Sequence, residues 1–144
     1  MLFEAGLMDS FSKHALVAVV DDDELIRNSI ADLLLSAGIE SRTFSSGEEF
    51  LADGIAQETM CLVTDIRMPG MTGLELQREL ADHHSWVPII FITALEDTRL
   101  RAQAMRAGAV EFLLKPVDDE VLLYSVQAAL RCYPLTPGRG TSCQ

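Results

Sequence analysis

A short apolar run leads into an aspartate, a turn and a helix start at residues 61–73, which read Cys-Leu-Val-Thr-Asp-Ile-Arg-Met-Pro-Gly-Met-Thr-Gly. The first four residues are apolar or β-branched and predict a buried strand, and the Pro-Gly pair predicts a turn. Thr72 with Glu75 is typical of a capping box, which predicts that a helix begins here. The segment therefore places Asp65 at the carboxyl end of a strand.

Four further predicted strands alternate with helical patterns on either side of this segment. They cover residues 16–20, 40–44, 89–93 and 110–114. Apolar residues recur at helical spacing between the first two strands and end at Gly38, and Ser46 with Glu49 indicates a capping box before a second helix. Two more helices are expected over about 98–107 and 118–131.

This alternation is typical of a parallel sheet with right-handed crossover helices. It predicts an α/β fold: a doubly wound, flavodoxin-like parallel sheet of five strands in the order 2-1-3-4-5, with five helices. We expect a leader over residues 1–14, one domain over 15–131, and a tail or linker stub over 132–144.

The composition excludes several classes of protein. A length of 144 residues and a hydrophobic share of 49% suit a single domain with its own core. Eleven basic against 22 acidic residues give a net charge of -11, which argues against direct binding of nucleic acid or an anionic membrane. There is no signal-peptide pattern and no apolar run of the ~20 residues that a membrane span needs. The sequence therefore predicts a cytoplasmic protein.

Charged and polar residues follow four of the predicted strands. Asp21 and Asp22 come after the first, Asp65 after the third, Thr93 ends the fourth, and Lys115 follows the fifth. In the predicted strand order the first and third strands are neighbours, so the three carboxylates should converge. Two like charges ~4 Å apart repel by roughly 4 kcal/mol at an effective dielectric constant near 20.

A hard cation relieves such repulsion, and Mg²⁺ prefers carboxylates, waters and a phosphoryl oxygen. With Lys115 and the Thr93 hydroxyl, the set predicts a site for phosphoryl transfer to Asp65. Each element alone also has a plainer interpretation, as a helix start, a turn or a strand exit. Their joint occurrence at one edge of the sheet favours the phosphoryl-transfer hypothesis.

These motifs resemble those of the receiver domains of two-component response regulators. The similarity covers about residues 15–131 and rests on Val-Val-Asp-Asp-Asp after the first strand, Thr-Asp-Ile-Arg-Met-Pro-Gly-Met-Thr-Gly, Ile-Thr-Ala and Phe-Leu-Leu-Lys-Pro, in the right order and spacing. The sequence around Asp65, together with Ala-Gly-Ala-Val-Glu-Phe before Lys115, is most similar to that of receivers of nitrogen-fixation-type transcription regulators.

The resemblance implies that Asp65 accepts a phosphoryl group in a phosphorelay, from a sensor histidine kinase, a histidine phosphotransfer protein or a small acyl phosphate. Asp22, Asp65 and the carbonyl oxygen of Arg67 would bind Mg²⁺, with Mn²⁺ able to substitute, and Asp21 would hold a metal-bound water. A receiver is a signalling phosphoacceptor that catalyses its own phosphorylation and dephosphorylation, not a conventional enzyme.

The resemblance also implies a switch. Lys115 would pair with the phosphoryl oxygens, Thr93 would move in to bond one of them, and Phe112 would turn inward as an aromatic switch. The Lys115–Pro116 peptide bond is expected to be cis. The surface formed by the fourth helix, fifth strand and fifth helix would then change. Because the fifth helix is apolar nearly all round, we expect a homodimer or an effector contact through the fourth and fifth helices.

Two other classes stay open at this point. Asp21 and Asp23, with Glu96 and Asp97 after the fourth strand, faintly resemble the acids of haloacid-dehalogenase-type phosphatases, in which the first aspartate is the nucleophile. Asp65 has no role in that alternative. The second is an interaction module that keeps the receiver fold without being phosphorylated.

Overall fold

The computed structural model describes residues 16–83 and 85–132. The expected leader lies outside the described residues, as does the expected tail apart from Cys132. Five strands occur in the described part of the chain: β1 (Leu16–Val20), β2 (Glu40–Phe44), β3 (Thr59–Thr64), β4 (Ile89–Thr93) and β5 (Glu111–Leu114). They alternate with the helices α2 (Glu24–Ser36), α3 (Gly47–Asp53), α4 (Gly73–Asp82), α5 (Thr98–Arg106) and α6 (Asp119–Cys132), and with a short 3₁₀ helix, η1 (Ile55–Glu58).

The sheet is parallel, and its strand order β2-β1-β3-β4-β5 confirms the predicted topology. Val20 at the end of β1 lies opposite Thr64 at the end of β3. The backbone N–H of Asp65 continues this ladder by donating to the carbonyl of Val20 at 3.1 Å. Asp21 and Asp65 therefore leave neighbouring strands at the same level.

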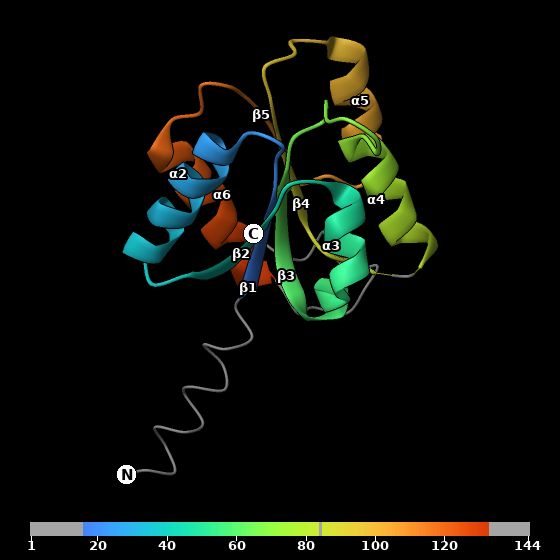
Figure 1. Cartoon of the computed structure of the whole chain (residues 1–144). Coiled ribbons are helices and arrows are strands. Elements are labelled where there is room, and N and C mark those ends of the chain that lie inside the picture. Colours follow the sequence, from blue (N-terminus) through green and yellow to red (C-terminus); the bar gives the residue numbers. More distant parts are fainter. Residues whose placement is uncertain (1–15, 84, 133–144) are drawn as a thin grey trace.

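Helices cover both faces of the sheet, α2 and α6 on one and α3, α4 and α5 on the other (Figure 1). All five residues of β1 are buried, and alternate ones pack into different cores. Val17 and Val19 join the core beneath α2 and α6, whereas Ala18 and Val20 join the core beneath α3, α4 and α5. Burial on both faces explains why β1, β3 and β4 read as nearly continuous apolar runs, whereas β2, at the edge of the sheet, is polar and largely exposed.

Several element boundaries differ from the sequence prediction. β3 begins two residues earlier than predicted, at Thr59, directly after the unpredicted helix η1. The hydroxyl of Thr59 donates to the carbonyl of Ile55, a local bond that joins the two elements. β5 begins one residue later, and α6 runs one residue further, to Cys132. No helix in the described parts of the chain is long and apolar enough to cross a membrane.

Both predicted helix starts hold, with Ser46 and Thr72 as N-caps, but only one of the two capping boxes is complete. Thr72 and Glu75 form the complete capping box at the start of α4. The Ser46 side chain also caps α3, but the carboxylate of Glu49 accepts from the backbone N–H of Ser45, at 2.7 Å, rather than from that of Ser46. The second capping box is therefore wrong by one residue on its return bond.

Candidate functional site

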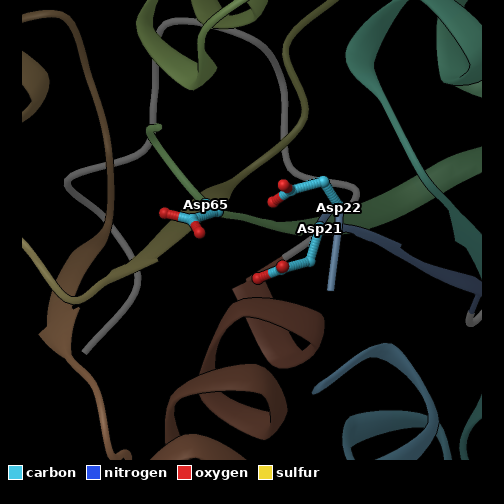
Figure 2. Close-up of side chains that lie close together, drawn as sticks. All are labelled: Asp21, Asp22 and Asp65. Carbon is cyan, nitrogen blue, oxygen red and sulfur yellow. The ribbon is translucent and has the colours of Figure 1, made fainter. Parts of the chain in front are cut away.

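Three carboxylates meet where β1 and β3 end (Figure 2). Asp21, Asp22 and Asp65 each bring a carboxylate oxygen to within 4.8 Å of the others. Asp21 is fully buried and Asp65 is nearly so, whereas Asp22 is exposed. The convergence predicted from the strand order is therefore present in the structure.

Lys115 supplies the opposing charge. Its Nζ donates to Asp65 Oδ2 at 2.8 Å and to Asp21 Oδ2 at 3.0 Å, and its side chain is 17% exposed. The residue directly follows β5, and its backbone N–H donates to the carbonyl of Thr93 at 2.8 Å. The Lys115–Pro116 peptide bond is cis. One ammonium group thus bridges two of the three carboxylates from across the crevice.

The pKa values of this group reflect burial and pairing. Burial raises the pKa of Asp21 above its ordinary value, and this effect outweighs the backbone N–H of Asp23 and the ammonium of Lys115, which both lower it. Burial by itself would lower the pKa of Lys115, but its hydrogen bonds to Asp65 and Asp21 hold that pKa above the ordinary value. The lysine is therefore charged at neutral pH.

Backbone groups hold the second oxygen of Asp65. Its Oδ1 accepts from the N–H of Ile66 at 2.6 Å and from that of Arg67 at 3.3 Å. Gly73, the first residue of α4, lies so close to the Asp65 carbonyl that a Cβ there would collide with it, and its N–H donates to the carbonyl of Ile66. Glycine at this position lets α4 begin directly behind the aspartate, a steric requirement that the sequence pattern did not reveal.

Arg27 is a second residue at the site that sequence reasoning missed. From the first turns of α2, its Nη1 donates to the backbone carbonyl of Asp21 at 2.7 Å. The contact brings a cation to the edge of the acid pocket and ties α2 to the end of β1. Nothing in the sequence distinguishes this arginine from one exposed to solvent on a helix.

Thr93 and Phe112 are buried in the structure. Thr93 is 1% exposed, and its Oγ1 accepts from the backbone N–H of Leu95 at 3.1 Å, so its hydroxyl is engaged locally. Phe112 is 4% exposed and packs against Phe91 with ring centroids 6.4 Å apart. The ring of Phe112 therefore belongs to the core beneath α3, α4 and α5.

The acids of the phosphatase alternative have other partners. Asp23 Oδ1 accepts from two backbone N–H groups of α2, at 2.9 and 3.4 Å, and is the N-cap of that helix. Asp97 caps α5 in the same way. Asp23 and Asp97 thus satisfy helix ends, and neither belongs to the carboxylate cluster that Asp21 forms with Asp22 and Asp65.

The donor set suits a small hard cation. Three carboxylates supply oxygen ligands, and Mg²⁺ typically binds through one or two carboxylates plus water and phosphate oxygens. The lysine beside them suits a phosphoryl group. The fold and site together define a doubly wound α/β domain with a cation-binding acid pocket at its topological switch point.

Comparison with known proteins identifies this domain. The family model of the response regulator receiver domain matches residues 17–127, and the chain belongs to that family. Nodulation protein W of Bradyrhizobium diazoefficiens is 45% identical over 118 residues, which cover 82% of this chain and 52% of that protein. FixJ of Rhizobium meliloti is 41% identical, over 78% of this chain and 55% of that protein.

The solved structures agree. The crystal structure of FixJ-N is 40% identical to this chain, with a TM-score of 0.73 over 81% of this chain and 93% of that one. The response regulator StyR is 44% identical, with a TM-score of 0.76 over 81% of this chain and 59% of that one. The chain spans about half the length of the curated relatives it matches. Receiver domains are signalling modules that bind Mg²⁺ through acidic residues.

Replacing Lys115 tests the charge balance of the pocket. Lys115→Met leaves the carboxylates of Asp21 and Asp65 without their cation, and we expect it to lower the free energy of unfolding at neutral pH by about 2–4 kcal/mol. The matched control, Arg42→Met, breaks the exposed Arg42–Asp53 pair (3.1 Å) and should cost less than about 1 kcal/mol.

The pH dependence of this effect has a definite sign. The pKa of Asp21 is higher in the folded protein than its ordinary 3.8, so the folded state binds the proton more tightly and protonation stabilises the fold. Without Lys115 this pKa rises further. The stability that Lys115→Met loses relative to the wild type should therefore shrink as the pH falls from about 7 toward about 4. The melting temperatures of the two proteins in metal-free buffer measure this difference. A deficit that stays constant or grows on acidification would contradict this account.

Proposed function

We propose that Asp65 is the phosphoacceptor of a two-component phosphorelay, receiving its phosphoryl group from a sensor histidine kinase, a histidine phosphotransfer protein or a small acyl phosphate. The single observation that carries the proposal is the setting of the Asp65 carboxylate. One oxygen accepts hydrogen bonds from two backbone N–H groups, and the other accepts one from the ammonium of Lys115. Two further carboxylates lie alongside.

The transfer needs positioning and charge compensation rather than a separate base. A carboxylate oxygen of Asp65 attacks the phosphorus, a new O–P bond forms, and the donor's N–P or O–P bond breaks to release imidazole or a carboxylate. Lys115 is placed to neutralise charge on the phosphoryl oxygens. In the reverse half-cycle, water attacks the phosphorus, inorganic phosphate leaves, and the carboxylate is regenerated.

The residues that would hold Mg²⁺ are Asp22, Asp65 and the carbonyl oxygen of Arg67, with Asp21 holding a metal-bound water and Mn²⁺ able to substitute. The bound cation supplies charge neutralisation for the approach of an anionic phosphoryl group to three carboxylates. Asp22 supports this assignment by its exposure, because a ligand to a partly hydrated ion needs access to water.

A phosphorylated Asp65 would change the contacts of Lys115, and the structure links Lys115 to the neighbouring strand. Its backbone N–H bonds the carbonyl of Thr93, whose hydroxyl in turn accepts from Leu95 ahead of α5. We infer that Thr93 moves to bond the phosphoryl group and that Phe112, on β5, repacks with it. The surface formed by α5, β5 and α6 then carries the output for transcription regulation in the cytoplasm.

Asp65→Asn tests the proposal directly. We expect the wild-type chain to gain one phosphoryl group from acetyl phosphate in the presence of Mg²⁺, detected by intact mass and located on Asp65 by peptide mapping. Asp65→Asn should gain none, because an amide oxygen is a poor nucleophile and forms no acyl phosphate. Asp32→Asn, an exposed position on α2, is the control and should behave as wild type.

Two outcomes would favour the alternatives. Hydrolysis of a phosphoryl donor that survives Asp65→Asn but is lost with Asp21→Asn would point to the phosphatase mechanism. A wild-type chain that takes up no phosphoryl group, with or without Mg²⁺, would leave an interaction module that works without phosphorylation.

An exposed apolar surface beside the switch residues supports homodimerisation. Val110 and Leu114 at β5, and Val121 and Tyr124 on α6, are 42%, 41%, 47% and 66% exposed. β5 is an edge strand, so this surface is open to a partner. Exposed apolar patches of this kind mark interaction sites. We infer that phosphorylation favours a dimer through α5 and α6, with Arg99 and Arg106 available for ion pairs.

Light scattering tests the dimer. We expect the phosphorylated wild type to shift toward twice the monomer mass and Val121→Glu to remain monomeric, because the new charge would be buried at the interface. Leu35→Glu is the control, since this leucine is 72% exposed but lies on α2, which packs on β1 and β2 toward the edge of the sheet opposite β5. A wild type that is monomeric in both phosphorylation states would remove the dimer.

A further inference from the structure

α3 contacts the loop that carries the phosphoacceptor site. Residues 65–72 join β3 to α4, and we call them the β3–α4 loop. Oε2 of Glu48, in the first turn of α3, accepts from the backbone N–H of Met71 in this loop at 2.9 Å. The two residues are 23 positions apart in the sequence, so the bond joins two separate crossover connections.

Two glycines shape this contact. Gly70 has a φ of +78°, and a Cβ there would lie 2.6 Å from Oε2 of Glu48. A Cβ on Gly47 would lie 3.1 Å from the sulfur of Met71. Each glycine thus makes room for the other segment's side chain, so the carboxylate reaches the loop backbone without displacement. The fit is reciprocal, which distinguishes it from a chance surface bond.

Asp65 bonds the Val20 carbonyl and the Lys115 ammonium, and the remaining hydrogen bonds of the loop are local. Ile66 and Arg67 bond to Asp65, and Thr72 bonds within the capping box of α4. Among the hydrogen bonds of the described residues, the Glu48–Met71 bond is the only one that ties residues 67–72 to an element other than β3 or α4. It acts at Met71, the residue before the N-cap Thr72, so it restrains the loop near its α4 end.

We propose that Glu48 is a positioning residue for the phosphoacceptor site: by holding Met71 it fixes the β3–α4 loop, and with it the Arg67 backbone, in the conformation that binds the cation. This inference rests on the proposed function. A loop that is already ordered loses less conformational entropy when a ligand binds, so affinity rises without a new contact to the ligand. Glu48 would act through the loop and would not touch the metal or the phosphoryl group.

The neighbouring Glu49 provides a matched comparison. It lies in the same first turn of α3, carries the same charge and also accepts from a backbone N–H, but its partner is Ser45, ahead of α3. Glu49→Ala therefore removes an equal charge and an equal kind of bond without releasing the loop. Glu48→Gln removes the charge of Glu48 but keeps an acceptor oxygen.

Three measurements on the full chain test the inference. We expect Glu48→Ala to speed amide hydrogen exchange across residues 67–72 in metal-free protein, whereas Glu49→Ala leaves that segment unchanged. The Mg²⁺ concentration that gives half of the melting-temperature shift should rise about two- to tenfold in Glu48→Ala. This range corresponds to the loss of one hydrogen bond. Glu48→Gln should recover most of this loss.

The rate of labelling of Asp65 by acetyl phosphate separates positioning from a general structural defect. In Glu48→Ala it should fall by a similar factor at low Mg²⁺ and approach the wild-type rate at saturating Mg²⁺. Equal exchange and equal Mg²⁺ requirement in the two alanine variants would overturn the inference, as would a defect that Glu48→Gln shares in full. A wild type that binds Mg²⁺ but is never labelled would instead refute the proposed function, and the exchange and binding measurements would still decide the role of Glu48.

Discussion

Repulsion among three carboxylates, relieved by one lysine, is the constraint on which this domain depends. Asp21 and Asp65 leave neighbouring strands at the same level, and β5 delivers Lys115 to within 3.0 Å of both. A single ammonium cannot neutralise three acids, so the pocket keeps an excess negative charge in the absence of a cation. That residual charge makes the pocket attract a divalent cation and, once the cation is present, accept an anionic phosphoryl group.

The same lysine connects the pocket to the proposed output surface. Lys115 directly follows β5, bonds the backbone of Thr93 at the end of β4, and is separated from α6 by three residues. Any change in what its ammonium binds therefore acts on the two strand ends that border α5 and α6. Phe112 lies on β5 beneath α5, with the Arg101 guanidinium 5.9 Å from its ring centroid and its carbonyl accepting from Arg101 at 3.4 Å. These short contacts give a physical route from chemistry at Asp65 to the exposed apolar surface.

Much of this arrangement was predictable from the sequence because it follows from strand ends. The apolar runs locate the strands, the alternation with helices gives a parallel sheet, and the strand order brings Asp21, Asp65 and Lys115 to one edge. Other contacts were not predictable. Arg27 bonds the Asp21 carbonyl, Glu48 bonds Met71 across 23 residues, and Gly73 is required by the closeness of α4 to Asp65. These contacts depend on how helices pack on the sheet, which no local pattern encodes.

The most direct test of the central claim is the melting temperature of the chain with and without Mg²⁺, measured for the wild type and for Asp65→Asn. If the acid pocket holds a cation, Mg²⁺ at ten times its dissociation constant stabilises the wild type by about 1.4 kcal/mol. That corresponds to a rise of about 3–7 °C for a domain of this size. Asp65→Asn removes one metal ligand and one repelling charge. Its melting temperature should therefore rise much less with Mg²⁺ than that of the wild type. A wild-type melting temperature that does not change with millimolar Mg²⁺, or that rises equally in Asp65→Asn, would contradict the account.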